Sequence, residues 1–288
     1  MMRMLTMCAA AAATLCLNQT ASALGANDVR GGWEMTRNGV EHIYQFKVRG
    51  NQVTGIACGD CDDATTLAFL RGKLGPGGLT FVVTHVRDDG STAYRDRVTG
   101  TIDDGALRVK GTRGGPDGGA FTWTMHREEP PPMPRAAAAR VGAAPGAGAG
   151  AAARPVPPPY RPPGPWEQLS DSNVAGVWLA GSGKFKQFFI IRKAGDQLLG
   201  MLCGPCNHTY FMQILDDFSI HGDTLNFNVL HEQGRNAPYY NRVTAQVSRN
   251  EMHLEVVPTG LDGKPLGALQ HAAMTLLGPL TLAATATR

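Results

Sequence analysis

A repeat in the two halves of the chain constrains the fold more than any other feature of the sequence. Three short motifs of the first half recur in the same order in the second half. They are Gly31-Gly32-Trp33 with Gly176-Val177-Trp178, Cys58-Gly59-Asp60-Cys61 with Cys203-Gly204-Pro205-Cys206, and Arg97-Val98-Thr99 with Arg242-Val243-Thr244. The offset is the same at the second and third motifs, because 203 − 58 = 145 and 242 − 97 = 145, and between them it is 146, where Leu79-Thr80-Phe81 matches Leu225-Asn226-Phe227. One unit of roughly 100 residues therefore occurs twice.

Each copy alternates apolar and polar residues with a period of two, and Gly, Asp and Asn separate the runs. This pattern predicts short β-strands. In the first copy we expect eight strands, near residues 31–37, 42–49, 52–58, 65–71, 79–85, 94–102, 106–111 and 120–127. The second copy predicts the same series. Eight sequential antiparallel strands close most simply into an up-and-down barrel, because closure removes exposed strand edges.

A short motif in the first copy resembles the signature of the lipocalin/calycin barrels. Gly31-x-Trp33 opens the first expected strand, and Arg127 ends the last one. The resemblance implies that the Trp plugs the barrel floor and that the Arg packs over it. The second copy keeps Trp178, but Leu276-Leu277 stand near the place of the Arg. The resemblance identifies no specific family, and an unrelated β-barrel or sandwich is the alternative.

The sequence thus predicts an all-β protein with two tandem eight-stranded antiparallel up-and-down, lipocalin-like barrels joined by a disordered Pro/Ala/Gly linker. The expected boundaries are 1–26 for a signal peptide, 27–129 for the first barrel, 130–165 for the linker and 166–288 for the second barrel. Arg3, an apolar run and Ala21-Ser22-Ala23 have the order of an export signal. The linker has no apolar periodicity and therefore no means to form a core.

Charge and hydropathy narrow the range of partners. The formal net charge is +3, and the basic residues are scattered along the sequence. We therefore expect no nucleic-acid partner, which would need a basic patch or stripe. The N-terminal apolar run is shorter than the roughly 20 residues that cross a bilayer, so we expect no transmembrane segment. The export signal predicts a periplasmic or secreted protein, for which association with the cell envelope is one option.

Four cysteines follow the expected signal peptide: Cys58, Cys61, Cys203 and Cys206. In an exported protein, we expect each Cys-x-x-Cys pair to form a local disulfide at the end of the third strand. Two alternatives stay open. Four thiolates have the spacing of a zinc site, although such a site would have to form between the copies. The Cys-Gly-Pro-Cys sequence matches the thioredoxin tetrapeptide, but that motif needs a strand–turn–helix setting. We expect neither a metal nor a cofactor.

Candidate ligand-binding residues gather at one expected rim of each barrel. Odd strands end where even strands begin, so the cysteine turn should share an opening with the His and Tyr of the fifth and sixth strands. The alternation of faces turns these rings, their Phe neighbour and the following Asp or Asn inward. Arg97 and Arg242 fall on the outward face. The inward residues are His85, Tyr94, Phe81 and Asp96 in the first copy, and His231, Tyr239, Phe227 and Asn241 in the second.

Three functions fit this pattern. The first is an exported binding protein whose two calyx-like barrels hold a small apolar molecule, oriented by the rim residues. The second is an enzyme of the isomerase, cyclase, lyase or hydrolase type that uses acid–base chemistry in the same cavity. Its candidate catalytic residues are His85, Tyr94, Asp96, His231 and Tyr239. The third is a structural or interaction module of the cell envelope. The change from Asp96 to Asn241 argues against an essential carboxylate in both copies.

Overall fold

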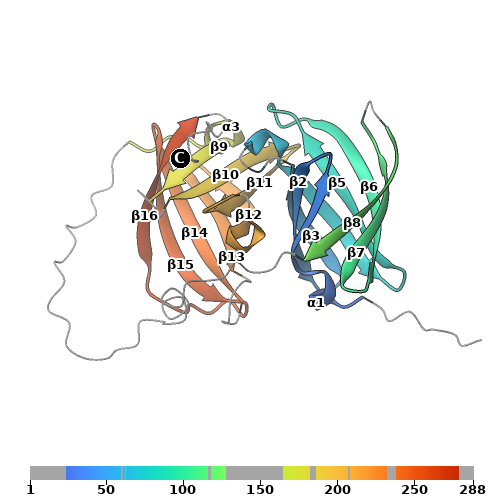
Figure 1. The fold of residues 1–288 in the computed structure, drawn as a ribbon. Coiled ribbons are helices and arrows are strands. Elements are labelled where there is room, and N and C mark those ends of the chain that lie inside the picture. Colours follow the sequence, from blue (N-terminus) through green and yellow to red (C-terminus); the bar gives the residue numbers. More distant parts are fainter. Residues whose placement is uncertain are drawn as a thin grey trace, which may run out of the picture.

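The computed structural model consists of two closed antiparallel barrels that lie side by side (Figure 1). It describes residues 24–59, 61, 63–115, 118–127, 165–181, 186–206, 208–231 and 238–278. The expected signal peptide and linker lie almost entirely outside the described residues. Within these residues, no helix has the length and apolar character needed to cross a bilayer. The predicted fold class is confirmed.

Barrel 1 contains eight strands in sequential order. They are β1 (Gly31–Arg37), β2 (Val40–Arg49), β3 (Gln52–Cys58), β4 (Ala68–Gly75), β5 (Gly78–Val86), β6 (Thr92–Asp103), β7 (Ala106–Arg113) and β8 (Gly119–Arg127). Helix α1 (Ala26–Val29) precedes β1, and the 3-10 turn η1 (Ala64–Thr66) precedes β4. This turn explains why β4 begins three residues later than expected. The barrel closes where Trp33 of β1 pairs with Arg127 of β8.

Barrel 2 repeats this order. Its strands are β9 (Gly176–Ala180), β10 (Gln187–Ala194), β11 (Gln197–Cys203), β12 (Met212–His221), β13 (Thr224–His231), β14 (Tyr239–Ser248), β15 (Glu251–Gly260) and β16 (Gln270–Gly278). Helix α3 (Asp171–Val174) and the 3-10 turn η3 (Thr209–Phe211) correspond to α1 and η1. A bulge in β12 between Asp216 and Ser219 interrupts the register. It accounts for the one-residue change in offset that follows in the sequence.

The floor of each barrel is plugged by a Trp, as the lipocalin-like signature implies. Trp33 is fully buried, and its indole N–H donates to the carbonyl of Val29 at 2.8 Å. The Arg127 guanidinium lies 4.6 Å from the Trp33 ring centroid and donates to three carbonyls at the end of α1. In barrel 2, Trp178 donates to Val174 in the same way. Leu276 pairs with Trp178 there, so this barrel lacks the covering Arg.

The barrels pack through the outer faces of β2–β4 and β10–β12, which the sequence analysis did not foresee. Apolar residues of both barrels form one buried cluster there, and several equivalent positions of the two copies belong to it. The matched pairs, 145 residues apart, are Ile56 with Met201, Leu67 with Met212, and Phe69 with Ile214. The same patch on both partners is the signature of a two-fold interface. Residues 43–48 of β2 are buried without interruption, which indicates a strand covered on both faces.

Two buried cations complete the contact between the barrels. Arg192 of β10 is 1% exposed and donates to the carbonyls of Thr65, Leu67, Val86 and Arg87 of barrel 1. Lys47 of β2 is 2% exposed and forms an ion pair with Asp216 of barrel 2. The two cations occupy equivalent positions, because 192 − 47 = 145. Each barrel therefore inserts one charged side chain into the other.

Candidate functional site

The mouth of barrel 1 holds a pocket of about 130 Å³. It lies where β1, β3, β5 and β7 end and where β2, β4, β6 and β8 begin. Its polar and aromatic lining residues are Arg37, His42, Tyr44, His85, Tyr94, Asp96, Arg113 and Trp123. A cavity of about 150 Å³ accommodates one benzene molecule, so this pocket has the size of a single ring.

A histidine–aspartate pair forms one wall of the pocket. Nε2 of His85 lies 3.3 Å from Oδ2 of Asp96, and the other oxygen of this buried carboxylate accepts from the backbone N–H of Gly114 at 3.2 Å. The Tyr94 ring stacks on His85 with a centroid distance of 4.2 Å. Because an ionised carboxylate only accepts hydrogen bonds, this contact places a proton on Nε2 of His85. Burial lowers the pKa of His85, and Asp96 opposes this shift.

Two further rings of the pocket are held in their neutral forms. Burial, followed by the positive charges of Arg37 and Arg113, lowers the pKa of His42. Burial, followed by the charge of Asp96, raises the pKa of Tyr44 far above its ordinary value. At neutral pH these side chains therefore act as uncharged donors and acceptors.

Two arginines give the pocket its electrostatic character. The guanidinium carbons of Arg37 and Arg113 lie 5.5 and 6.0 Å from the centroid of the Trp123 ring. The buried Nε of Arg113 has no hydrogen-bond partner among the described residues. With both histidines neutral, two guanidinium groups face one carboxylate, so the lining carries a net positive charge. Such a site favours an anion, for which the planar guanidinium is a bidentate donor.

Barrel 2 has the same ring pair, with a neutral Asn in place of the Asp. His231 stacks on Tyr239 with a centroid distance of 4.6 Å, and Nδ2 of Asn241 lies 2.8 Å from Nε2 of His231. An amide donor leaves Nε2 as the acceptor, so the proton of this histidine sits on Nδ1. Burial lowers the pKa of His231 to about 4. The equivalent histidines of the two copies therefore face different partners, a carboxylate in barrel 1 and an amide in barrel 2.

The other polar residues of the first mouth also have uncharged counterparts in barrel 2. The common offset and the strand register identify the residues of barrel 2 that correspond to His42, Tyr44, Arg113 and Trp123. The counterparts are Gln187, Phe189, Pro258 and Ala272. At these described positions, the ionisable and indole side chains of the first mouth are therefore absent from barrel 2.

The expected site residues separate into a rim and a core. Cys58, His85, Tyr94 and Asp96 line the pocket of barrel 1 together. Phe81 lies deeper, in edge-to-face contact with Phe46 at 5.4 Å. Phe227 likewise stacks on Phe218 within the core of barrel 2 at 5.2 Å. The alternation of faces places both Phe rings correctly inside but does not bring them to the opening.

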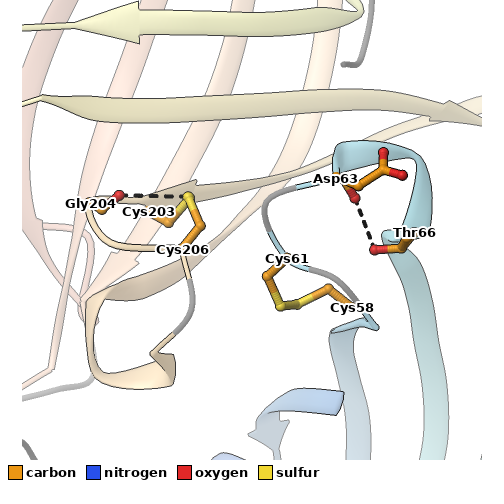
Figure 2. Close-up of a disulfide and its surroundings, with 7 residues drawn as sticks. All are labelled: Cys58, Cys61, Asp63, Thr66, Cys203, Gly204 and Cys206. Atoms are coloured by element: carbon orange, nitrogen blue, oxygen red, sulfur yellow. Dashed lines mark hydrogen bonds between the residues drawn. A yellow bond between two sulfur atoms is a disulfide. The ribbon is translucent and has the colours of Figure 1, made fainter. Parts of the chain in front are cut away.

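The cysteines form two local disulfides, as predicted. Cys58 pairs with Cys61 and Cys203 with Cys206, each with a Cα–Cα distance of 5.1 Å. Figure 2 shows the two turns facing each other where the barrels meet, and all four cysteines belong to the buried interface cluster. Next to the first turn, the hydroxyl of Thr66 donates to the carbonyl of Asp63 at 2.9 Å. The cysteine turns therefore serve the contact between the barrels, and only Cys58 also reaches the pocket.

Sequence reasoning missed Arg37, His42, Tyr44, Arg113 and Trp123. Odd strands end at the rim where even strands begin, and this rule, which located His85, would have found most of them. The first and seventh strands end at the same rim, at Arg37 and Arg113, and the second and eighth strands begin there. Applying the rule to all eight strands predicts a cationic mouth in the first copy.

No protein-family model matches the chain, and no curated protein matches it either. Among solved structures, one match is a protein with unknown function from the DUF3598 family of Nostoc punctiforme. It is 10% identical, the match covers 88% of this chain and 97% of that chain, and the TM-score is 0.22. A similarity at this level says nothing about a ligand.

Proposed function

We propose that the protein is an exported binding protein that holds a small organic anion at the mouth of barrel 1. The ligand has a ring-sized apolar body and a carboxylate. The observation that carries this proposal is the position of Arg37 and Arg113 beside Trp123, above a pocket of about 130 Å³. The guanidinium groups would bind the carboxylate, and the neutral histidines and tyrosines would orient it. Barrel 2 would support barrel 1 structurally.

A site of this kind differs from the apolar calyx expected from the sequence. The interior of barrel 1 is filled by a continuous apolar core that includes Trp33, Phe46, Phe81 and Leu107. The pocket of about 130 Å³ lies at the charged opening. Two local disulfides also suit a protein that works in an oxidising compartment, outside the cell or in the periplasm.

Titration with benzoate tests this proposal, with benzamide as the neutral analogue of the same shape. We expect benzoate to bind and Arg113→Gln to weaken its binding about tenfold, because one charge-assisted contact is lost. The exposed Arg242→Gln variant in barrel 2 is the matched control, and we expect it to leave binding unchanged. Equal affinities for benzoate and benzamide would contradict an anion site.

The His85–Asp96 pair supports proton transfer on the bound anion as a second candidate function. A carboxylate that accepts from one ring nitrogen leaves the other nitrogen free to act as a base. Incubation of a panel of ring-sized carboxylates in deuterium oxide would detect exchange at acidic carbon positions by mass spectrometry. Exchange that Asp96→Asn abolishes without loss of ligand binding would favour catalysis, whereas binding without exchange would favour a binding protein.

A further inference from the structure

The strand register of barrel 1 gathers basic side chains that are far apart in the sequence. Arg95 and Arg97 of β6, Arg108 and Lys110 of β7, and Lys73 of β4 all lie exposed on the outer face. One cross-strand row runs from Lys73 through Thr80 and Thr99 to Lys110. The second row contains Val82, Arg97 and Thr112. We call this surface, on the outer side of β4–β7, the cationic face.

The cationic face carries little opposing charge. Arg108 pairs with Asp103 at the hairpin end, with a distance of 3.0 Å between Nε and Oδ2. Among the described residues, no carboxylate pairs with Lys73, Arg95, Arg97 or Lys110. A shallow hollow of about 560 Å³ lies over the centre of this face. Strands β6 and β7 lie on the side of barrel 1 away from barrel 2 (Figure 1), and β5 reaches the neighbouring barrel only at its end, through Val86.

Barrel 2 shows that the fold does not require these charges. Only one of the five basic positions keeps its charge there, as Arg242 in place of Arg97. The matching cross-strand row in barrel 2 is Ser219, Asn226, Thr244 and Glu255. Tyr240 and His253 replace Arg95 and Arg108. The same scaffold therefore folds with a near-neutral face, and the positive charge is a property of barrel 1 alone.

We propose that the cationic face binds an acidic polysaccharide that carries carboxylates. Arginine and lysine bind carboxylates, and the threonine hydroxyls between them can donate to and accept from sugar hydroxyls. This site is separate from the pocket at the barrel mouth.

The shape and composition of the face favour a polysaccharide over other polyanions. Four neighbouring strands cover about half the circumference of an eight-stranded barrel, so the surface is convex. A flexible chain can follow this curve, whereas a planar bilayer would touch only part of it. Single-stranded nucleic acid would stack its bases on exposed aromatic rings. Among the described lining residues of the hollow, the only ring belongs to Phe81, which is buried in the core.

Affinity electrophoresis in gels that contain polygalacturonate tests the proposal, with neutral dextran as the reference polymer. We expect retardation by polygalacturonate alone and a loss of affinity as salt rises from about 50 to 200 mM, since counterions compete for the charges. The combined variant Lys73→Glu, Arg97→Glu and Lys110→Glu should weaken binding at least about tenfold at low salt. The Gln versions of the three changes should have an intermediate effect.

The matched control removes the same number of positive charges from exposed positions of barrel 2, through Arg242→Glu, Arg249→Glu and Lys264→Glu. It has the same net charge as the first variant, and we expect it to retain the affinity. Equal losses in both variants would overturn the proposal, because binding would then follow net charge alone. Tighter binding to phosphatidylglycerol vesicles or to a ~20-nucleotide oligothymidylate than to polygalacturonate would also overturn it. Circular dichroism verifies that the variants are folded.

Discussion

Barrel 1 and barrel 2 share their strand order, cross-strand pairing, disulfide turn, buried Trp and stacked His–Tyr pair, yet they differ in most other polar residues at the mouth. His42, Asp96, Arg113 and Trp123 of the first mouth correspond to Gln187, Asn241, Pro258 and Ala272 in the second. The cationic face of barrel 1 is likewise close to neutral in barrel 2. The comparison separates two sets of positions. Those that define the barrel are retained, and those that define its chemistry have diverged.

The interface between the barrels retains part of its pattern. Ile56 with Met201 and Phe69 with Ile214 are apolar in both copies, whereas the buried Ile190 corresponds to Gln45. The buried cations Lys47 and Arg192 occupy equivalent positions. Both copies contribute corresponding strands to the contact, although the two cations bind different partners.

Removal of the interface cations should have the largest effect on stability. Arg192→Ala leaves four carbonyls of barrel 1 without their donor, and we expect a loss of about 4 kcal/mol. Lys47→Ala should cost less, about 2 kcal/mol, because Asp216 retains access to water. Guanidinium denaturation measures both losses. A larger effect of Lys47→Ala would contradict the unequal roles assigned to the two cations, and Arg192→Lys serves as the charge-conserving control.

Acidification should lower the stability of the folded protein through His231. His231 has a pKa of about 4 in the folded protein and about 6.5 in the unfolded chain. Between these values the unfolded state binds a proton that the folded state rejects, so stability falls as pH decreases from 6.5 to 4 and then levels off. The loss should be on the order of 3 kcal/mol and should disappear in His231→Gln. Stability curves at several pH values test this. An unchanged pH dependence in His231→Gln would assign the effect to another group.

Exchange of Asp96 and Asn241, the residues that contact the two histidines, should have the smallest effect on stability. It should have the clearest effect on the pKa values of the histidines. Asp96→Asn gives barrel 1 the pair found in barrel 2, and we expect it to lower the pKa of His85, because a negative charge and an acceptor are lost. Asn241→Asp should raise the pKa of His231 for the converse reason. Proton NMR titration of the ring signals measures both shifts. Shifts of the same sign in the two variants would contradict the role assigned to the carboxylate.

Much of the fold was predictable because it depends on local patterns. The period of two in the expected strands, with Asn and Gly in the turns, gave seven of the eight strands of the first copy nearly at their observed positions. Asn38-Gly39 and Asp104-Gly105 adopt the left-handed conformations that tight hairpins require. The strand near 65–71 was placed too early, because η1 occupies residues 64–66 and shifts β4 toward the C-terminus.

The candidate site was predictable only in part. His85, Tyr94 and Asp96 were found because the alternation of faces and the end of each strand can be inferred from the sequence. Arg37 and Arg113 were not found, since they are 76 positions apart (113 − 37 = 76) and meet only when β1 and β7 end at the same rim of the closed barrel.

The sequence by itself determined the duplication, the β-strands, the inward faces and the pairing of neighbouring cysteines, because each depends on spacing along the chain. Only the tertiary structure decided that the two barrels pack through β2–β4 and β10–β12, that Arg192 enters barrel 1, and that scattered lysines and arginines form one cationic face. These features depend on which strands lie side by side after closure. Residues that are distant in the chain then share one surface, and their charges add.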